Sequence, residues 1–180
     1  MKGKIFNIYE AFICEAYSEQ AWDIILEASN KVHQIDLISP KSDLDSDFKA
    51  IIVATSRVLE MAIPDLLGLF GLYAFPYFKK YLPSYFDESK DVLEMILKIP
   101  EVLVVDIKKA LPEVYLPEVS VERVNEKEVE LKYHSRRKMC EFLEGLILAC
   151  ANSYGEEVRI THHRCMHYGH DFCSIAICKV

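Results

Sequence analysis

The sequence predicts an α+β domain in which a helical part comes first and a roughly four-stranded antiparallel sheet with an inserted helix follows. Apolar residues recur at helical spacing through the first two-thirds of the chain. From Pro117 onwards they alternate with charged residues, as in half-buried strands. The chain has 180 residues, 51% of them hydrophobic, which is enough for one substantial core. We therefore expect a single domain over residues 1–180, with the helical part at about 1–112 and the sheet-containing part at about 113–180.

The helical part is expected to be a series of helices separated by prolines and polar breaks. Apolar spacing predicts helices at 5–17, 22–26, 48–55, 64–75 and 88–110. Pro76 should disturb the fourth of these, because proline lacks an amide donor and clashes with the preceding turn. Pro100 lies inside the fifth and should kink or divide it. The sequence Leu82-Pro83-Ser84-Tyr85 is expected to be a break between these two helices.

The sheet-containing part is expected to begin with a hairpin. Alternating residues at 119–121 and 129–133 predict two antiparallel strands joined around Asn125-Glu126-Lys127. Ser135 is a candidate cap for a helix at 136–154. Strands at 158–161 and 173–178 should complete the sheet, joined by a loop rich in His and Cys.

Charge and composition exclude several classes of function. The formal net charge is −7, and Lys and Arg do not form a basic stripe, so we expect no nucleic-acid partner. No apolar run is long enough to span a bilayer, and the stretch from Met1 to Tyr17 predicts a helix and not a signal peptide. We expect a cytoplasmic protein whose six cysteines stay reduced, so that clustered cysteines indicate metal or redox chemistry.

Residues 161–173 gather four of the six histidines and two cysteines into one short loop. His162 and Cys165 are spaced to chelate one ion from a single turn, and Cys173 at the start of the last strand can return to it. Cys140 on the preceding helix is the best candidate for a fourth ligand. The set Cys140, His162, Cys165 and Cys173 then predicts a closed tetrahedral zinc site of the structural type, whose thiolates could also respond to oxidants by releasing the metal.

The alternative is a polar loop whose histidines face water, but the density of ligands favours zinc. The other histidines of the loop are expected to be solvated: His163, His167 and His170. The other cysteines are expected to be small buried hydrophobic residues: Cys14, Cys150 and Cys178.

Three motifs occur in order along the chain: Met1-Lys2-Gly3-x-Ile5-Phe6-Asn7, Asp65-Leu66-Leu67-Gly68-Leu69-Phe70-Gly71 and Tyr133-x-Ser135-x-Arg137. In order and spacing they resemble bacterial heme nitric-oxide/oxygen-binding (H-NOX) domains. In that family the third motif binds the heme propionates, for which hydroxyls and a guanidinium are suitable donors. Without the resemblance, these residues would be a strand end, a helix cap and an exposed arginine. Some members of the family also carry zinc ligands at the positions of the four residues selected above.

The sequence departs from the family pattern at two positions. The family's histidine ligand to heme iron aligns with Val104, which has no lone pair to donate. A tyrosine that stabilises bound O₂ in some members aligns with Phe142. Heme could therefore bind through propionate contacts and packing alone, or with a replacement ligand such as His33 or Cys14. Otherwise the pocket would hold another flat or aliphatic molecule, or be collapsed and empty.

The resemblance implies a sensor that passes a signal to a separate protein such as a histidine kinase or a cyclic-di-GMP enzyme, with nitric oxide as the family's ligand. The alternative is a heme-independent binding module for a hydrophobic small molecule, similar to vinyl-reductase-like regulatory domains. Enzymatic activity is not expected, because the sequence contains no nucleophile–base arrangement and no phosphate-binding glycine loop. A closed zinc site would also leave no position for a substrate.

Overall fold

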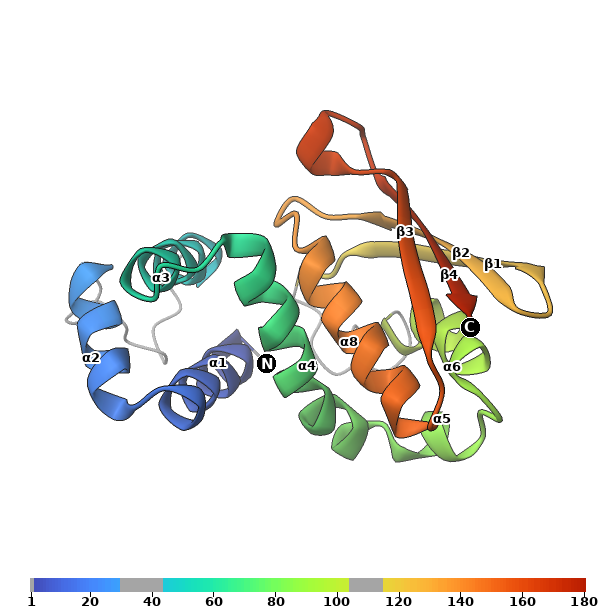
Figure 1. The fold of residues 1–180 in the computed structure, drawn as a ribbon, viewed down its shortest axis with the longest axis horizontal. Helices are drawn as coiled ribbons and strands as arrows, with labels where there is room; N and C mark the ends of the chain where they lie inside the picture. Colours follow the sequence, from blue (N-terminus) through green and yellow to red (C-terminus); the bar gives the residue numbers. More distant parts are fainter. Residues whose placement is uncertain (1, 30–43, 104–114) are drawn as a thin grey trace.

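The computed structural model describes residues 2–29, 44–103 and 115–180, with the side chains described from residue 5 in the first range and from residue 47 in the second. The N-terminal helices lie at one end of the molecule and the sheet at the other, with two central helices between them (Figure 1). The described part contains α1 (Lys2–Ala16), α2 (Glu19–Ala28), α3 (Leu44–Val58), α4 (Ile63–Tyr81), α5 (Pro83–Asp87), α6 (Val92–Glu101), β1 (Glu118–Asn125), β2 (Glu128–His134), α8 (Cys140–Ser153), β3 (Val158–Arg164), a short 3₁₀ turn η2 (Met166–Tyr168) and β4 (Cys173–Lys179). The predicted α+β order, helices first and then a sheet with an inserted helix, is confirmed.

The first four helices surround an aromatic core. Tyr9 and Phe70 are fully buried, and their ring centroids lie 4.9 Å apart in an edge-to-face arrangement. Phe48 and Trp22 also pack against Tyr9. Because these rings come from α1, α2, α3 and α4, the core joins all four helices into one unit.

Helix α4 continues through Pro76 to Tyr81, six residues beyond the predicted end at Phe75, so the disturbance expected at Pro76 does not interrupt the helix. A proline inside a helix removes one backbone hydrogen bond, but packing can compensate for that loss. On α4 the compensation comes from buried side chains that pack into two hydrophobic cores: Phe70 and Ala74 into the aromatic core, and Phe75 into the core beside the sheet. The break expected at 82–85 contains a short helix, α5.

Helix α6 begins at Val92 and not near Glu88, because Asp91 is its N-cap. The Asp91 carboxylate accepts a hydrogen bond from the Glu94 amide at 2.8 Å. The α-helical pattern ends at Glu101, directly after Pro100, and Val102 and Leu103 continue in a wider π-helical turn. Pro100 therefore disturbs the helix as predicted, and the rest of the predicted helix lies outside the described residues.

The sheet has the order β1-β2-β4-β3, with all neighbouring strands antiparallel. The predicted hairpin is present, since β1 and β2 pair on either side of the turn at Glu126 and Lys127. One face of the sheet is covered by α6 and α8, which form a second core with it (Figure 1). This core buries Leu131, Ile147 and Ile175.

Helix α8 begins at Cys140, four residues later than predicted, so Ser135 is not its N-cap. The Ser135 hydroxyl instead accepts a hydrogen bond from the Arg137 amide at 3.2 Å. Lys138 then has a positive φ of 50°, a left-handed conformation that no helix interior contains. The chain therefore makes a turn between β2 and α8 before the helix starts.

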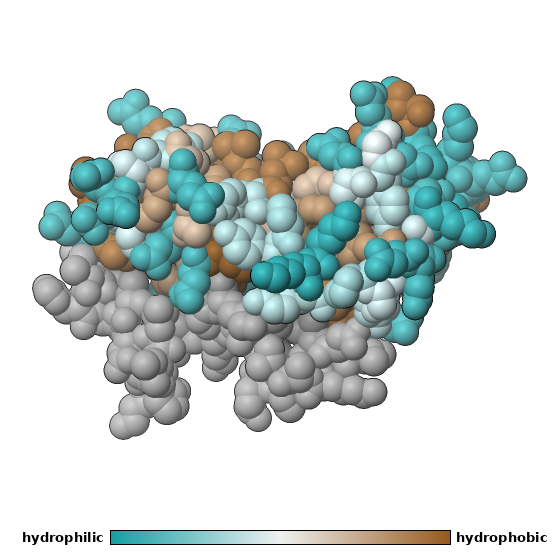
Figure 2. Space-filling model, turned by 90° about the horizontal axis from the view of Figure 1, so that it is seen from below, coloured by the Kyte–Doolittle hydropathy of each residue, from teal (hydrophilic) through white to brown (hydrophobic). Residues whose placement is uncertain are grey.

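No single helix within the described residues is long and apolar enough to cross a membrane. The pair Asp47–Val58 and Ile63–Tyr81 passes that test only when taken together, and it is bent by 110°. On the face shown in Figure 2, hydrophilic side chains predominate at both ends of the molecule, and apolar side chains gather between them.

Candidate metal centre and carboxylate-binding residues

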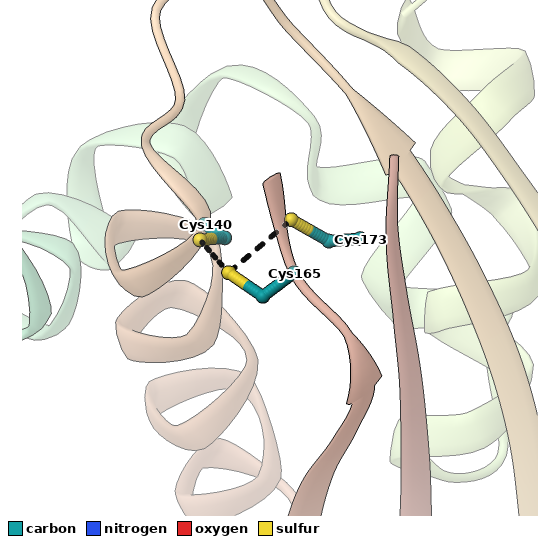
Figure 3. Close-up of side chains that lie close together, drawn as sticks. All are labelled: Cys140, Cys165 and Cys173. Atoms are coloured by element: carbon teal, nitrogen blue, oxygen red, sulfur yellow. Dashed lines mark hydrogen bonds between the residues drawn. The ribbon is translucent and has the colours of Figure 1, made fainter. Parts of the chain in front are cut away.

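Three of the four predicted metal ligands converge. The sulfur atoms of Cys140, Cys165 and Cys173 all lie within 4.8 Å of one another (Figure 3). The Sγ atom of Cys165 is 3.8 Å from that of Cys140 and 3.9 Å from that of Cys173. All three side chains are buried, and none of them forms a disulfide. The three cysteines that the sequence selected as ligands therefore lie together in the fold.

The fold gathers these thiols by placing each at the end of an element. Cys140 is the first residue of α8, Cys173 is the first residue of β4, and Cys165 follows β3 directly. Strands β3 and β4 pair up to Arg164 opposite Ser174, so Cys165 and Cys173 flank the last pair of the ladder. The start of α8 lies against this end of the sheet (Figure 3). An ion held by the three thiolates would tie the helix to both strands.

The three thiols differ in acidity. Burial raises the pKa of Cys140, and the neighbouring Glu141 carboxylate and the other two cysteines raise it further. Burial also raises the pKa of Cys173. Burial alone would raise the pKa of Cys165 too, but hydrogen bonds from the His167 amide and from neighbouring side chains outweigh it and lower the pKa. Cys165 is therefore the thiol of the three that most readily becomes a thiolate, the form that binds metal.

His162, the fourth predicted ligand, lies beside the cluster but outside the group of mutually close sulfur atoms. Its Nε2 atom is 2.7 Å from Oε1 of Glu144 on α8. The hydrogen bond with Glu144 raises the pKa of His162, burial opposes the shift, and the Cys165 side chain adds to it. A histidine that ligates metal through one nitrogen commonly donates its other N–H to a carboxylate, so Glu144 fits that supporting role. Sequence reasoning missed Glu144, although it lies one helical turn after Cys140.

A second group of possible ligands was also missed. One ligand atom each of Cys140, Glu141 and His167 lies within 4.8 Å of the others. Nε2 of His167 is 3.4 Å from Oε1 of Glu141 and 2.9 Å from the Lys138 carbonyl oxygen. The side chain of His167 is 41% exposed, in agreement with the expectation that this histidine is solvated. The signal in the sequence was weak, because the contact depends on the turn at Lys138 and on η2.

The remaining cysteines and histidines stay apart from these groups. Cys150 is buried on α8, where burial raises its pKa to about 12, as expected for a cysteine packed in a core. Cys14 and Cys178 are only partly buried. His163 and His170 are exposed, as expected. His33 lies outside the described residues.

Tyr133, Ser135 and Arg137 lie along the turn that leads from β2 into α8. The Tyr133 hydroxyl is buried and accepts a hydrogen bond from the Met139 amide at 3.3 Å. Ser135 is also buried, whereas Arg137 is exposed at the surface. The Arg137 guanidinium lies 5.3 Å from the ring of Tyr115 and 3.5 Å from its carbonyl oxygen. The structure thus contains the strand end and the exposed arginine of the alternative interpretation.

A hollow of about 450 Å³ lies beside Tyr133, at β1 and β2. It is lined by residues of β1, β2 and the segment before β4: Glu118, Val119, Ser120, Lys132, Tyr133, His134, Asp171 and Phe172. Ser135 and Arg137 do not line it, and its wall is partly charged, so it differs from the apolar cavity that a flat ligand would need.

Phe142 packs between aromatic residues of α4. Its ring centroid lies 4.9 Å from that of Phe70 and 6.4 Å from that of Phe78. It therefore offers no hydroxyl where the family resemblance placed a tyrosine. Val104, aligned with the family's histidine ligand, lies outside the described residues.

An N-terminal helical part joined to a four-stranded sheet, with the Tyr-x-Ser-x-Arg segment between sheet and α8, defines a sensory domain of the H-NOX type. The Haem-NO-binding family model matches residues 2–162, and the chain belongs to that family. No curated protein sequence matches it.

Solved H-NOX structures resemble the chain over its full length. An H-NOX protein from S. oneidensis in the Fe(II)NO state is 27% identical, with a TM-score of 0.87, and the match covers 100% of this chain and 99% of that one. The domain from the same organism in the Fe(II)CO state is also 27% identical, with a TM-score of 0.85 and the same coverage. Unliganded Fe(II) H-NOX from K. algicida is 21% identical, with a TM-score of 0.86 over 100% of this chain and 97% of that one, which supports the fold alone.

Proposed function

We propose that this sensory domain holds a zinc ion through Cys140, Cys165, Cys173 and His162, and that the ion and its thiolates form its signalling element. The observation that carries the proposal is the burial of three sulfur atoms within 4.8 Å of one another. Three thiolates and one imidazole form a common structural zinc set. His162, paired with Glu144 and beside Cys165, is the proposed fourth ligand.

The proposed site is suited to respond to oxidation. An oxidant such as hydrogen peroxide takes two electrons from two thiolates, one S–S bond forms, and the peroxide takes up two protons and becomes water. A disulfide has lost the charge that held the ion, so zinc is released. Cys140 and Cys165 are close enough to be the first pair, with their sulfur atoms 3.8 Å apart.

Release of the ion would free the start of α8 from the two strands. Helix α8 is packed tightly along α4, which itself belongs to the aromatic core of the helical part. A shift at the start of α8 can therefore reach the other end of the molecule through contiguous packing. We propose that a separate signalling protein in the cytoplasm, such as a histidine kinase or a cyclic-di-GMP enzyme, recognises this change.

Heme is the second proposed component, and its support is the family membership. Tyr133, Ser135 and Arg137 are the residues that would hold its carboxylates, and heme would supply an iron centre for a gas such as nitric oxide. The described part of α6 contains no His, Cys or Tyr, and Val104 cannot ligate iron. We therefore propose that any heme is held by its carboxylates and by packing, without the usual histidine bond to iron.

Metal analysis of the purified protein, together with its absorption spectrum, tests both components. We expect one tightly bound zinc per chain that Cys165→Ser and Cys173→Ser each remove, whereas Cys178→Ser, a partly exposed cysteine outside the cluster, retains it. Peroxide should release the ion, and a thiol reductant should restore binding. Unchanged zinc in both cluster variants would contradict the proposed site. A sharp, stoichiometric Soret band typical of histidine ligation would contradict the proposed mode of heme binding.

A further inference from the structure

The carboxylate of Glu141 has an unusual environment at the start of α8. Its Oε2 atom is buried and has no hydrogen-bond partner among the described residues. A carboxylate oxygen taken out of water without a partner is unfavourable, so native proteins usually pair it with a donor or a cation. A hydrogen-bond donor, a water molecule or a cation would satisfy this oxygen, and the neighbouring thiol and imidazole favour a cation.

The donors around Glu141 are the ones that a transition-metal ion requires. The Cys140 thiol, a Glu141 oxygen and a ring nitrogen of His167 lie within 4.8 Å of one another, and Cys140 alone belongs also to the three-sulfur cluster. The Lys138 carbonyl oxygen accepts a hydrogen bond from Nε2 of His167 at 2.9 Å, which orients the imidazole ring and leaves Nδ1 as the nitrogen with a lone pair for an ion. Lys138 also reaches the Met166 carbonyl oxygen at 3.4 Å, which ties the turn before α8 to η2.

We propose that Cys140, Glu141 and His167 form a second position for a divalent ion of the zinc class, which shares the Cys140 thiolate with the first ion. This inference rests on the proposed zinc site, because the shared thiolate belongs to it. Sulfur, nitrogen and oxygen ligands together favour zinc over calcium or magnesium. The charges also balance, since three thiolates and one carboxylate carry four negative charges and two divalent ions carry four positive ones.

The two positions would differ in how tightly they hold metal. The first has a complete set of four protein ligands, whereas the second has three and leaves one position for water or a small anion. Two of its ligands reach the surface, because the side chains of Glu141 and His167 are 20% and 41% exposed. The second ion should therefore exchange more readily and should be the first that a chelator removes.

Equilibrium dialysis of the whole reduced protein against increasing zinc, with metal counted by mass spectrometry, tests the inference. We expect two ions per chain at saturation. Glu141→Gln, which keeps the shape of the side chain, and His167→Ala should each lose the weaker ion and keep the tighter one. His163→Ala and His170→Ala, exposed histidines of the same loop, should keep both. With cobalt in place of zinc, the weaker step should add thiolate-to-metal absorption that Glu141→Gln lacks.

The outcomes separate this inference from the proposed function. A single ion that His167→Ala leaves in place would overturn the second position and leave the first intact. A single ion lost in His167→Ala would also overturn it, because His167 would then be a ligand of the first ion. Cys165→Ser with unchanged metal content would instead contradict the first site, on which the shared thiolate depends.

Discussion

Gly71 and Gly145 bring the backbones of α4 and α8 into direct contact. A Cβ atom on Gly145 would lie 2.1 Å from the Gly68 carbonyl oxygen and 2.9 Å from the Cα atom of Gly71. Neither helix can accommodate that atom without moving, because the atoms it meets belong to the backbone. The central packing of the molecule therefore depends on the absence of a side chain at these two positions.

Gly145→Ala should destabilise the protein by about 1–3 kcal/mol, the usual cost of overpacking. Gly68→Ala is a matched control on α4, because its Cβ would meet its nearest atom, the Glu141 carbonyl oxygen, at an ordinary 3.9 Å. That variant should be neutral or more stable by up to about 1 kcal/mol, since alanine favours helix more than glycine does. Urea unfolding measures both, and equal effects of the two substitutions would contradict the close contact.

The hydroxyl of Tyr133 supports the start of α8. It accepts a hydrogen bond from the amide of Met139, the residue immediately before Cys140. Tyr133→Phe should lower the free energy of unfolding by about 1 kcal/mol, because the amide loses its partner inside the protein. Tyr168→Phe, at a side chain that is 85% exposed, is the control and should change nothing measurable. Equal stabilities of the two variants in urea unfolding would show that the hydroxyl does not support the helix.

Glu144 should determine how tightly His162 holds metal. Its carboxylate lies 2.7 Å from Nε2 of His162 and would orient the imidazole for ligation through the other nitrogen. Removal of such a supporting carboxylate commonly lowers metal affinity by about 10- to 100-fold. We expect a loss of that order for Glu144→Ala in competition with a chromophoric chelator, and none for the exposed Glu157→Ala. Unchanged affinity in Glu144→Ala would mean that His162 binds no metal or needs no support.

An ion pair at the start of α6 should make stability depend on acid pH. Burial alone would raise the pKa of Asp91, but hydrogen bonds from the Glu94 amide and from Lys179 outweigh it, so the pKa lies below its ordinary value of 3.8. Nζ of Lys179 is 3.2 Å from Oδ2 of Asp91. Because the folded pKa is the lower one, this stabilisation is complete above pH 3.8 and is lost as the pH falls through the folded pKa.

Asp91→Asn removes the negative charge but keeps the helix cap, because asparagine can still cap α6. The variant should be less stable than the wild type near pH 6, and the difference should shrink as the pH falls below about 4. Asp87→Asn, at an exposed carboxyl on α5, should follow the wild type. Unfolding free energies measured at several pH values check this, and a constant difference between wild type and Asp91→Asn would exclude the ion pair as its cause.

The sequence best predicted those features in which a distinctive residue type occurs at a distinctive spacing. Cys140, Cys165 and Cys173 could be selected because thiols are rare, and two of them flank one short loop. The hairpin at β1 and β2 was equally predictable, because few structures other than a hairpin combine alternating strands with a short polar turn. His162 was selected by the same spacing, but its partner Glu144 was not, because a single acidic residue on a helix has no distinctive pattern.

Local backbone conformation and long-range packing could not be predicted in the same way. The left-handed Lys138 delays the start of α8, and nothing in the sequence around it requires that conformation. The same turn brings His167 towards Glu141, so the sequence could not predict the second group of ligands either. Helix α4 runs through Pro76 because its packing into the two hydrophobic cores compensates for one lost hydrogen bond. Helix propensity, which depends on local sequence alone, does not include that packing.

Val104→His tests the alignment on which the altered heme chemistry depends. If Val104 occupies the position of the family's iron ligand, the new imidazole should bind heme iron, and the protein should retain heme with a sharp Soret band. Val105→His is a matched control, because in the helix that the sequence predicts over 88–110 a shift of one residue turns the side chain by about 100°. The measurement is heme titration of both variants and the wild type, followed by absorption spectroscopy.

Ligation in Val105→His but not in Val104→His would move the alignment by one residue. Ligation in neither would show that this chain has no heme site beside that segment, and the cysteine cluster would then be its only proposed sensing element.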